Sequence, residues 1–168
     1  MKPRRVPSRP RRQSGGAIIE FALVAVLFLT VLLAVVDFGR LLMTWNAASE
    51  ATRLGARVAV VCNKADASLI LAKMQRFLPQ LTSANVVIEW QNPDGVADPT
   101  CDAATCKGVQ VSIYNNAANP ADPNNLRLQP ISPFMGLVLP PVPAFATYLP
   151  RESMQSTSAA GDANPVCN

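Results

Sequence analysis

The sequence of 168 residues contains no histidine. Histidine is the usual general base of enzymes and a member of the Ser-His-Asp and Cys-His catalytic sets, so its absence excludes those arrangements. The acidic residues after Val61 have no motif spacing, and the sequence holds no glycine-rich phosphate-binding loop. We therefore predict a protein that is not an enzyme, with no catalytic residues, no cofactor and no small-molecule substrate.

Acidic residues are missing from the first 15 positions, which hold six of the fifteen Lys and Arg residues. From Gly16 onward, 15 − 6 = 9 positive residues face 11 negative ones, a net charge of −2. The basic excess therefore belongs to a short arm and not to a broad cationic surface, which argues against nucleic-acid binding. The arm also contains three prolines and has no apolar face, so we expect it to be disordered.

Charge is nearly absent from Ala17 to Val36, where Glu20 is the only charged residue. A helix over residues 17–36 would be about 30 Å long, the thickness of the hydrocarbon core of a bilayer, so we predict a membrane span. The basic arm predicts a cytoplasmic N-terminus and an outer C-terminal body. A secretory signal peptide is the alternative, but its apolar core of about 7 to 15 residues would end at a small-x-small site. Asp37 to Arg40 follow here instead.

Proline is also absent from Leu41 to Val61, so we predict that the helix continues to a length of about 45 residues, or about 67 Å. Small residues recur at every fourth position of this half and form a ridge that allows close helix packing. The alternative is that alanine, the best helix former, recurs by chance in an alanine-rich chain. The ridge consists of Ala47, Ala51, Gly55 and Ala59.

Glu20 requires an explanation, because a charge inside a span costs about 2.5 to 3.5 kcal/mol on insertion scales and usually has a partner. The span itself contains no cation. Cleavage between Gly15 and Gly16 would create one, the free amine of Gly16, with Glu20 and Phe21 as the fifth and sixth residues of the mature chain. This start, after a short basic leader and before a long apolar helix, resembles type IV prepilins. In that family the glutamate is taken to meet the N-terminal amine of a neighbouring subunit.

Three sequence elements in one helix narrow the resemblance. In order, they are Glu20-Phe21, Asp37-Phe38-Gly39-Arg40 and Arg53-Leu54-Gly55-Ala56-Arg57. Together they resemble the TadE-like proteins of tight-adherence (Tad, Flp-type) pilus systems, over about residues 11–61.

This resemblance implies a minor pilin or pseudopilin that a prepilin peptidase processes and that a Tad pilus needs for its assembly and for surface adhesion. It also implies three kinds of partner: the bacterial inner membrane, the peptidase, and other Tad pilins, including a second TadE-like protein. The 168 − 61 = 107 residues after Val61 argue against the role of the much shorter major pilin.

The remaining residues predict a small α+β head. Apolar residues with a period near 3.6 predict a helix over 67–78 that Pro79 ends. Alternating residues in 85–90 and 108–114 predict two antiparallel strands across the loop 91–107, with a third strand within 143–149. We expect residues 115–125 and 130–143 to be loops and the tail after Arg151 to be mobile.

The predicted fold class is therefore α+β, with a long N-terminal pilin-like helix that carries a small antiparallel-sheet head. Its predicted units are a cleaved leader (1–15), a long helix (16–61) and an extracytoplasmic head (62–168).

All four cysteines follow the predicted span, on the side expected to be oxidising, where a small head benefits from disulfides. Three pairings are open. We favour Cys101 with Cys106, which would close a short turn, and Cys62 with Cys167, which would tether the tail to the end of the long helix. A zinc site would need two more ligands beside Cys101 and Cys106, and neither histidines nor nearby cysteines supply them, so we predict no metal.

Two functional classes remain open. The first is the processed assembly component, and the second is an uncleaved signal anchor that holds a periplasmic binding module. The N-terminus of the membrane-bound protein distinguishes them, because assembly predicts Gly16 whereas an anchor predicts Met1 or Lys2.

Overall fold

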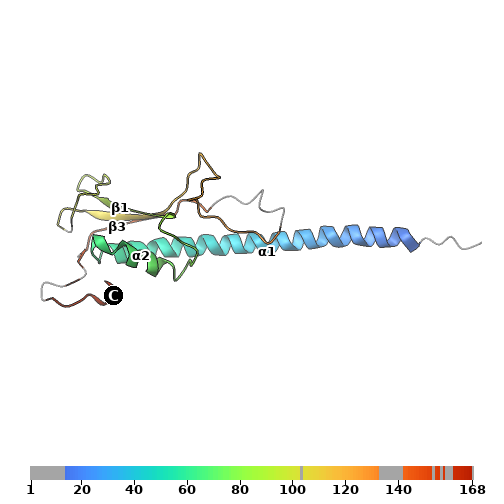
Figure 1. Ribbon diagram of the computed structural model, residues 1–168, viewed down its shortest axis with the longest axis horizontal. Helices are drawn as coiled ribbons and strands as arrows, with labels where there is room; N and C mark the ends of the chain where they lie inside the picture. Colours follow the sequence, from blue (N-terminus) through green and yellow to red (C-terminus); the bar gives the residue numbers. More distant parts are fainter. Residues whose placement is uncertain are drawn as a thin grey trace, which may run out of the picture.

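A long helix with a small head on its C-terminal half makes up the structure, a computed structural model that describes residues 14–102, 104–132, 142–152, 154–155, 157 and 161–167 (Figure 1). The predicted class, an α+β head on a long N-terminal helix, is confirmed. In chain order the elements are α1 (Ser14–Ala59), the 3-10 turn η1 (Lys64–Asp66), α2 (Ala67–Met74), β1 (Val86–Gln91), β2 (Gly108–Ile113), β3 (Ala146–Pro150) and the 3-10 turn η3 (Pro165–Cys167).

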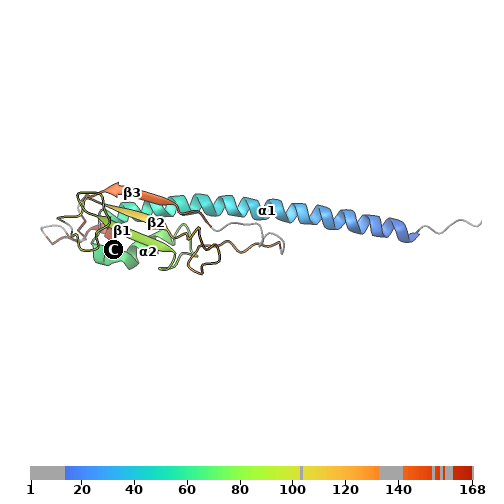
Figure 2. The ribbon, with the colours of Figure 1, turned by 90° about the horizontal axis from the view of Figure 1, so that it is seen from above.

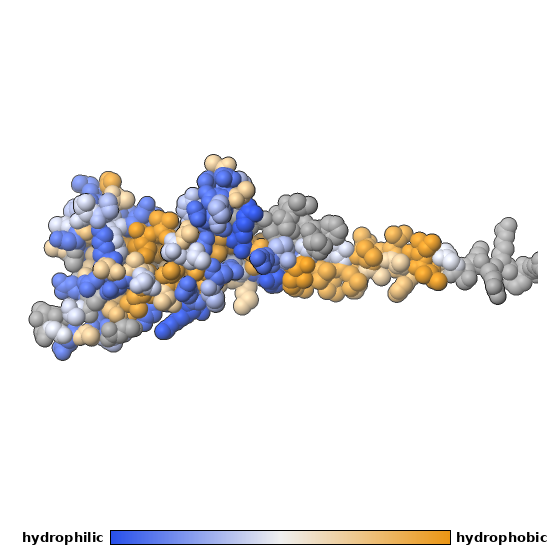
Figure 3. Space-filling view, in the orientation of Figure 1, coloured by the Kyte–Doolittle hydropathy of each residue, from blue (hydrophilic) through white to orange (hydrophobic). Residues whose placement is uncertain are grey.

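The first half of α1 extends beyond the described part of the head as an apolar rod, visible in orange in Figure 3. We call residues 17–36 the stem. Every stem side chain is exposed or half-buried, and none is buried. Among the described residues, α1 is the one helix long and apolar enough to cross a membrane, and its most apolar window has a mean hydropathy of 2.9 and no buried residue.

The head contains one antiparallel sheet with the strand order β1-β2-β3. The register pairs Val86 with Ile113 and Trp90 with Val109, so the apolar residues of β1 and β2 share one face, as predicted. β3 lies beside β2 and extends to Pro150, one residue beyond the predicted range. Figure 2 shows the sheet and α2 gathered around the second half of α1.

The core lies between the sheet, α2 and the second half of α1. Val109, Val111 and Ile113 of β2 are at most 1% exposed and face α1, while Ile70 and Met74 of α2 are fully buried. Burying side chains of this size contributes about 1.5 to 3 kcal/mol each relative to leaving them exposed. The head is therefore held to α1 by apolar packing rather than by a flexible linker.

The helix predicted over 67–78 ends early, at Met74. Residues 75–78 form tight turns, in which the Phe77 N–H bonds to the Met74 carbonyl at 3.0 Å, and Phe77 is half exposed instead of packing in the core. Pro79 ends the helical region by Leu78, because the residue before a proline is disfavoured in the α conformation, and the i→i−3 bonds of Arg76 and Phe77 tighten the turn before it.

The tail after Arg151, which we expected to be mobile, contacts the end of α1 in its described part. Met154 is 5% exposed, and its N–H donates to the Val60 carbonyl at 3.0 Å. The Gln155 N–H donates to the Val61 carbonyl at 2.9 Å. These contacts and a disulfide at Cys167 return the chain to the end of the long helix.

Candidate functional site

The residues of the predicted cleavage site lie at the free end of the stem. Gly15 and Gly16 are in the first turn of α1, and a Cβ atom added at either position would have no described atom within 4 Å outside its own part of the helix. Glu20 and Phe21 are exposed on the next turn, and Glu20 forms no ion pair with a described residue.

The ridge of small residues predicted for helix packing faces the chain's own head. Ala51 and Ala59 are fully buried and Ala47 is half-buried against the core. A Cβ atom added at Gly55 would lie 2.6 Å from the Met74 sulfur, closer than real contacts allow. A larger residue at Gly55 would therefore displace the Met74 side chain where α2 packs on α1, and this close approach occurs within one chain.

Asp37 and Arg40 form a clamp between α1 and a distant loop. Asp37 is fully buried, and its Oδ1 accepts a hydrogen bond from the Ile131 N–H at 2.9 Å. Its Oδ2 accepts one from the Ser132 N–H at 2.8 Å. Arg40 Nη1 donates to the Gln129 carbonyl at 3.2 Å and lies 3.5 Å from the Asp37 carboxylate.

The spacing of the two clamp residues explains their joint action. Positions three apart lie on one face of a helix, so Asp37 and Arg40 meet the loop 129–132 together. A buried carboxylate is costly unless it is paired and hydrogen-bonded, and here two amides and a guanidinium compensate it. The clamp therefore fixes the head to α1 one residue beyond the stem, at the point where the apolar surface meets polar chain.

A polar network stiffens the loop that leads to the clamp. Asn125 is 4% exposed, and its Oδ1 accepts a hydrogen bond from the Asn116 N–H at 2.6 Å. Asp122 accepts hydrogen bonds from the Asn124 N–H and from the Tyr114 hydroxyl. The Asn124 N–H and then the Asn116 amide lower the pKa of the Asp122 carboxyl below its usual value, and that carboxylate raises the pKa of Tyr114.

The four cysteines form two disulfides, which are the pairings favoured from the sequence. Cys62 bonds to Cys167 with a Cα–Cα distance of 5.5 Å, and Cys101 bonds to Cys106 with a Cα–Cα distance of 5.0 Å. The first joins the end of α1 to the tail, and the second closes a turn between β1 and β2.

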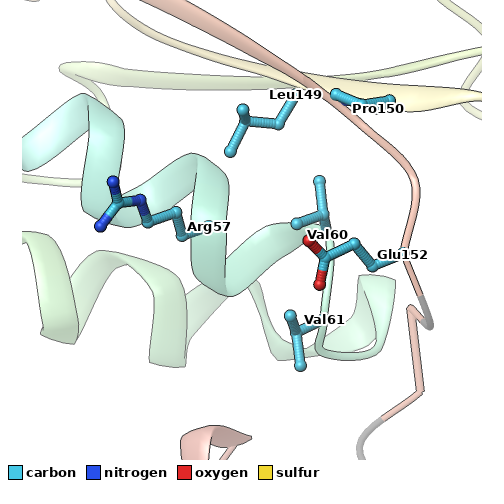
Figure 4. A pocket seen from close by; sticks show the side chains of 6 residues that line it. All are labelled: Arg57, Val60, Val61, Leu149, Pro150 and Glu152. Carbon is cyan, nitrogen blue, oxygen red and sulfur yellow. The ribbon is translucent and has the colours of Figure 1, made fainter.

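One of the cavities lies between the end of α1 and the end of β3 (Figure 4). Its volume is about 380 Å³, and Val60, Val61 and Leu149 supply much of its apolar lining. Arg57 and Glu152 stand on its rim, on α1 and just after β3. These groups make up no catalytic set, and the described residues hold no cluster of three or more potential metal ligands.

A single apolar N-terminal helix with a small head on its second half fits a membrane-anchored, pilus-related protein. The family model described as TadE-like protein matches residues 15–57, which include all three sequence elements and most of α1. The predicted resemblance is confirmed over this helix, and TadE-like proteins are a pilus-associated structural family rather than an enzyme family. No curated protein and no solved structure matches the chain.

The sequence pointed to Asp37 and Arg40 only as part of a family pattern and did not indicate what they contact. Their partners are backbone amides and a carbonyl 89 to 95 residues away. Contacts to backbone groups cannot be inferred from residue types, because nearly every residue has the same backbone N–H and carbonyl. The one available signal was an acidic residue placed directly after a long apolar run, where it has to be either exposed or paired.

Proposed function

We propose that this chain is a minor pilin or pseudopilin that a prepilin peptidase processes and that is needed to assemble a Tad pilus used in surface adhesion. The observation that carries the proposal is the match of residues 15–57 to the TadE-like family. The exposed stem supports it, because an apolar surface of this length requires lipid or neighbouring helices to cover it.

In this proposal the peptidase removes residues 1–15 and leaves Gly16 as the N-terminus of the long helix. Both glycines lie in the first turn of α1, and because glycine is a poor helix former this turn opens easily to the extended backbone that we propose the enzyme binds. Glu20 then meets the new amine of an adjoining pilin, so that each charge is neutralised on assembly. The partners are thus the peptidase and other Tad pilins, including a second TadE-like protein.

Before assembly the chain spans the bacterial inner membrane once, with its N-terminus in the cytoplasm and residues 62–168 in the periplasm. The basic arm supports this orientation. The two disulfides are also typical of an oxidising compartment. From the membrane the chain enters the growing pilus, with its head carried on the second half of α1.

The intact mass of the membrane-bound chain tests this proposal. We expect wild type and Gly15→Ala to start at Gly16, whereas Gly15→Leu should keep the whole leader because a bulky residue blocks the cut. Gly15→Ala is the matched control, since it changes the same position but stays small. A wild-type chain starting at Met1 or Lys2 would support the uncleaved signal anchor, and a start at Ala17 would contradict the chosen cleavage frame.

A further inference from the structure

The exposed apolar surface of α1 does not stop where the stem ends. Phe38, Leu42 and Met43 follow the stem and are 55%, 42% and 75% exposed. Ile131, which the clamp holds beside α1, is 56% exposed. We call these four residues the collar.

The collar residues of α1 lie on its exposed side and continue the apolar surface of the stem. Leu41, Thr44 and Ala48 are buried, whereas Phe38, Leu42 and Met43 occupy a part of α1 that stays exposed. Beyond the collar the exposed positions of α1 become polar, at Asn46 and Glu50. The apolar surface of α1 therefore runs from Ala17 to Met43.

The length of this surface identifies what covers it. Residues 17–36 correspond to about 30 Å of helix, which matches the hydrocarbon core of a bilayer. Residues 37–43 continue the helix for about 10 Å beyond that core on the side of the head, where the polar headgroups lie. The collar therefore falls at the depth of the headgroups on the side of the head.

The charged residues next to the collar also fit a position at the headgroup layer. Arg40 is the one cation of α1 between the stem and Met43, and it is half-buried in the clamp with 41% of its side chain exposed. Arginine at the end of a span extends its guanidinium toward the headgroups while its stem stays in apolar surroundings. Asp37 carries the opposite charge but is buried in the clamp, so it does not face the lipid.

We propose that the collar lies in the headgroup layer of the membrane, so that the head rests directly on the lipid surface with the clamp at the boundary. This inference rests on the membrane anchoring in the proposed function and adds a position and an interaction surface to it. The clamp holds Ile131 beside α1, facing the lipid. Because the clamp also fixes the head to α1, the head and the helix keep one orientation relative to each other.

The test uses spin labels on single introduced cysteines in the full chain, reconstituted in phosphatidylcholine vesicles after its own disulfides have formed. Met43→Cys and Ile131→Cys report on the collar, and the Ile131 change keeps the backbone N–H that the clamp uses. Val31→Cys reports on the stem, and Arg53→Cys reports on the exposed polar half of α1. The accessibility of each label to oxygen and to a water-soluble nickel complex gives its depth.

We expect the Val31 label to be deep in lipid and the Arg53 label to be in water, with both collar labels in between and several-fold less accessible to nickel than Arg53. Collar labels as accessible to nickel as Arg53 would overturn the inference. Collar labels shielded from both reagents only at high protein-to-lipid ratio would also overturn it, in favour of a second copy. A Val31 label in water would refute membrane anchoring itself, so the two failures are distinguishable.

Discussion

The two disulfides close loops of very different length, and this difference predicts unequal contributions to stability. Cys62 and Cys167 are 105 residues apart, whereas Cys101 and Cys106 are 5 apart. Replacing either pair with alanine removes one cross-link and leaves the other in place. Three of the four cysteines are at most 6% exposed, and Cys167 packs against the core, so both double variants remove sulfur from apolar surroundings.

The expected magnitudes follow from the entropy of loop closure in the unfolded chain. A loop of about 100 residues is worth about 4.7 kcal/mol, and the same relation gives about 2 kcal/mol for a loop of about six residues. Cys62→Ala/Cys167→Ala should therefore lower the free energy of unfolding of the head about twice as much as Cys101→Ala/Cys106→Ala. The tail contacts at Val60 and Val61 add to the loss in the first variant, because the disulfide holds them in place.

Urea unfolding of the full chain in detergent micelles measures this difference. Trp45 and Trp90 both pack in the head and not in the stem, so tryptophan fluorescence follows the head alone. Leader removal in cells should be the same for both variants, because the cut is remote from either disulfide. Equal losses, or a larger loss for the short loop, would refute the reasoning from loop length.

Two further changes test the contacts of α1. Gly55→Leu should lower the free energy of unfolding by about 1 to 3 kcal/mol through overpacking. The control Gly39→Leu should leave it unchanged, because a Cβ atom at Gly39 has no described neighbour within 4 Å. Equal urea midpoints for the two variants would contradict the close approach at Gly55. Asp37→Asn places an amide donor against one of the two loop N–H groups and should free the loop 129–132. Trypsin should then cut faster after the exposed Arg127 than in wild type or in the control Asp94→Asn, and an unchanged cutting rate would argue against the clamp.

Local patterns predicted most of the fold. The uninterrupted helix follows from the absence of proline over residues 17–61, and the strand pairing follows from alternating residues that meet across one loop. Each of these signals lies within a short stretch of sequence, where periodicity reports which face is buried. The early end of α2 at Met74 was not predicted, because the apolar period continues to Leu78 and does not distinguish an α-helical turn from a final 3-10 turn.

The contacts made across long sequence distances were harder to predict. The ridge at Ala47, Ala51, Gly55 and Ala59 indicates that something packs closely, but small residues do not say whether the partner is another chain or the head. The clamp joins Asp37 to backbone amides of a loop without any pattern. The disulfide between Cys62 and Cys167 was favoured among three possible pairings because it would tether the tail to the end of the long helix, and periodicity gives no such information.

The function of Glu20 is the central claim, and copurification of partner pilins with the chain tests it most directly. The measurement compares wild type, Glu20→Gln and the control Glu50→Gln, each as the only copy in the cell and at equal expression. Glu50 is exposed on the polar half of the same helix and pairs with Arg53 at the surface, where one ion pair contributes little.

We expect Glu20→Gln to be inserted and cleaved normally, because the stem keeps its length and the small residues at the cut are unchanged. It should nevertheless fail to copurify with partner pilins or to support piliation, since the buried amine of a neighbour loses its counter-charge. Glu50→Gln should behave like wild type. Normal copurification and piliation by Glu20→Gln would contradict charge pairing during assembly.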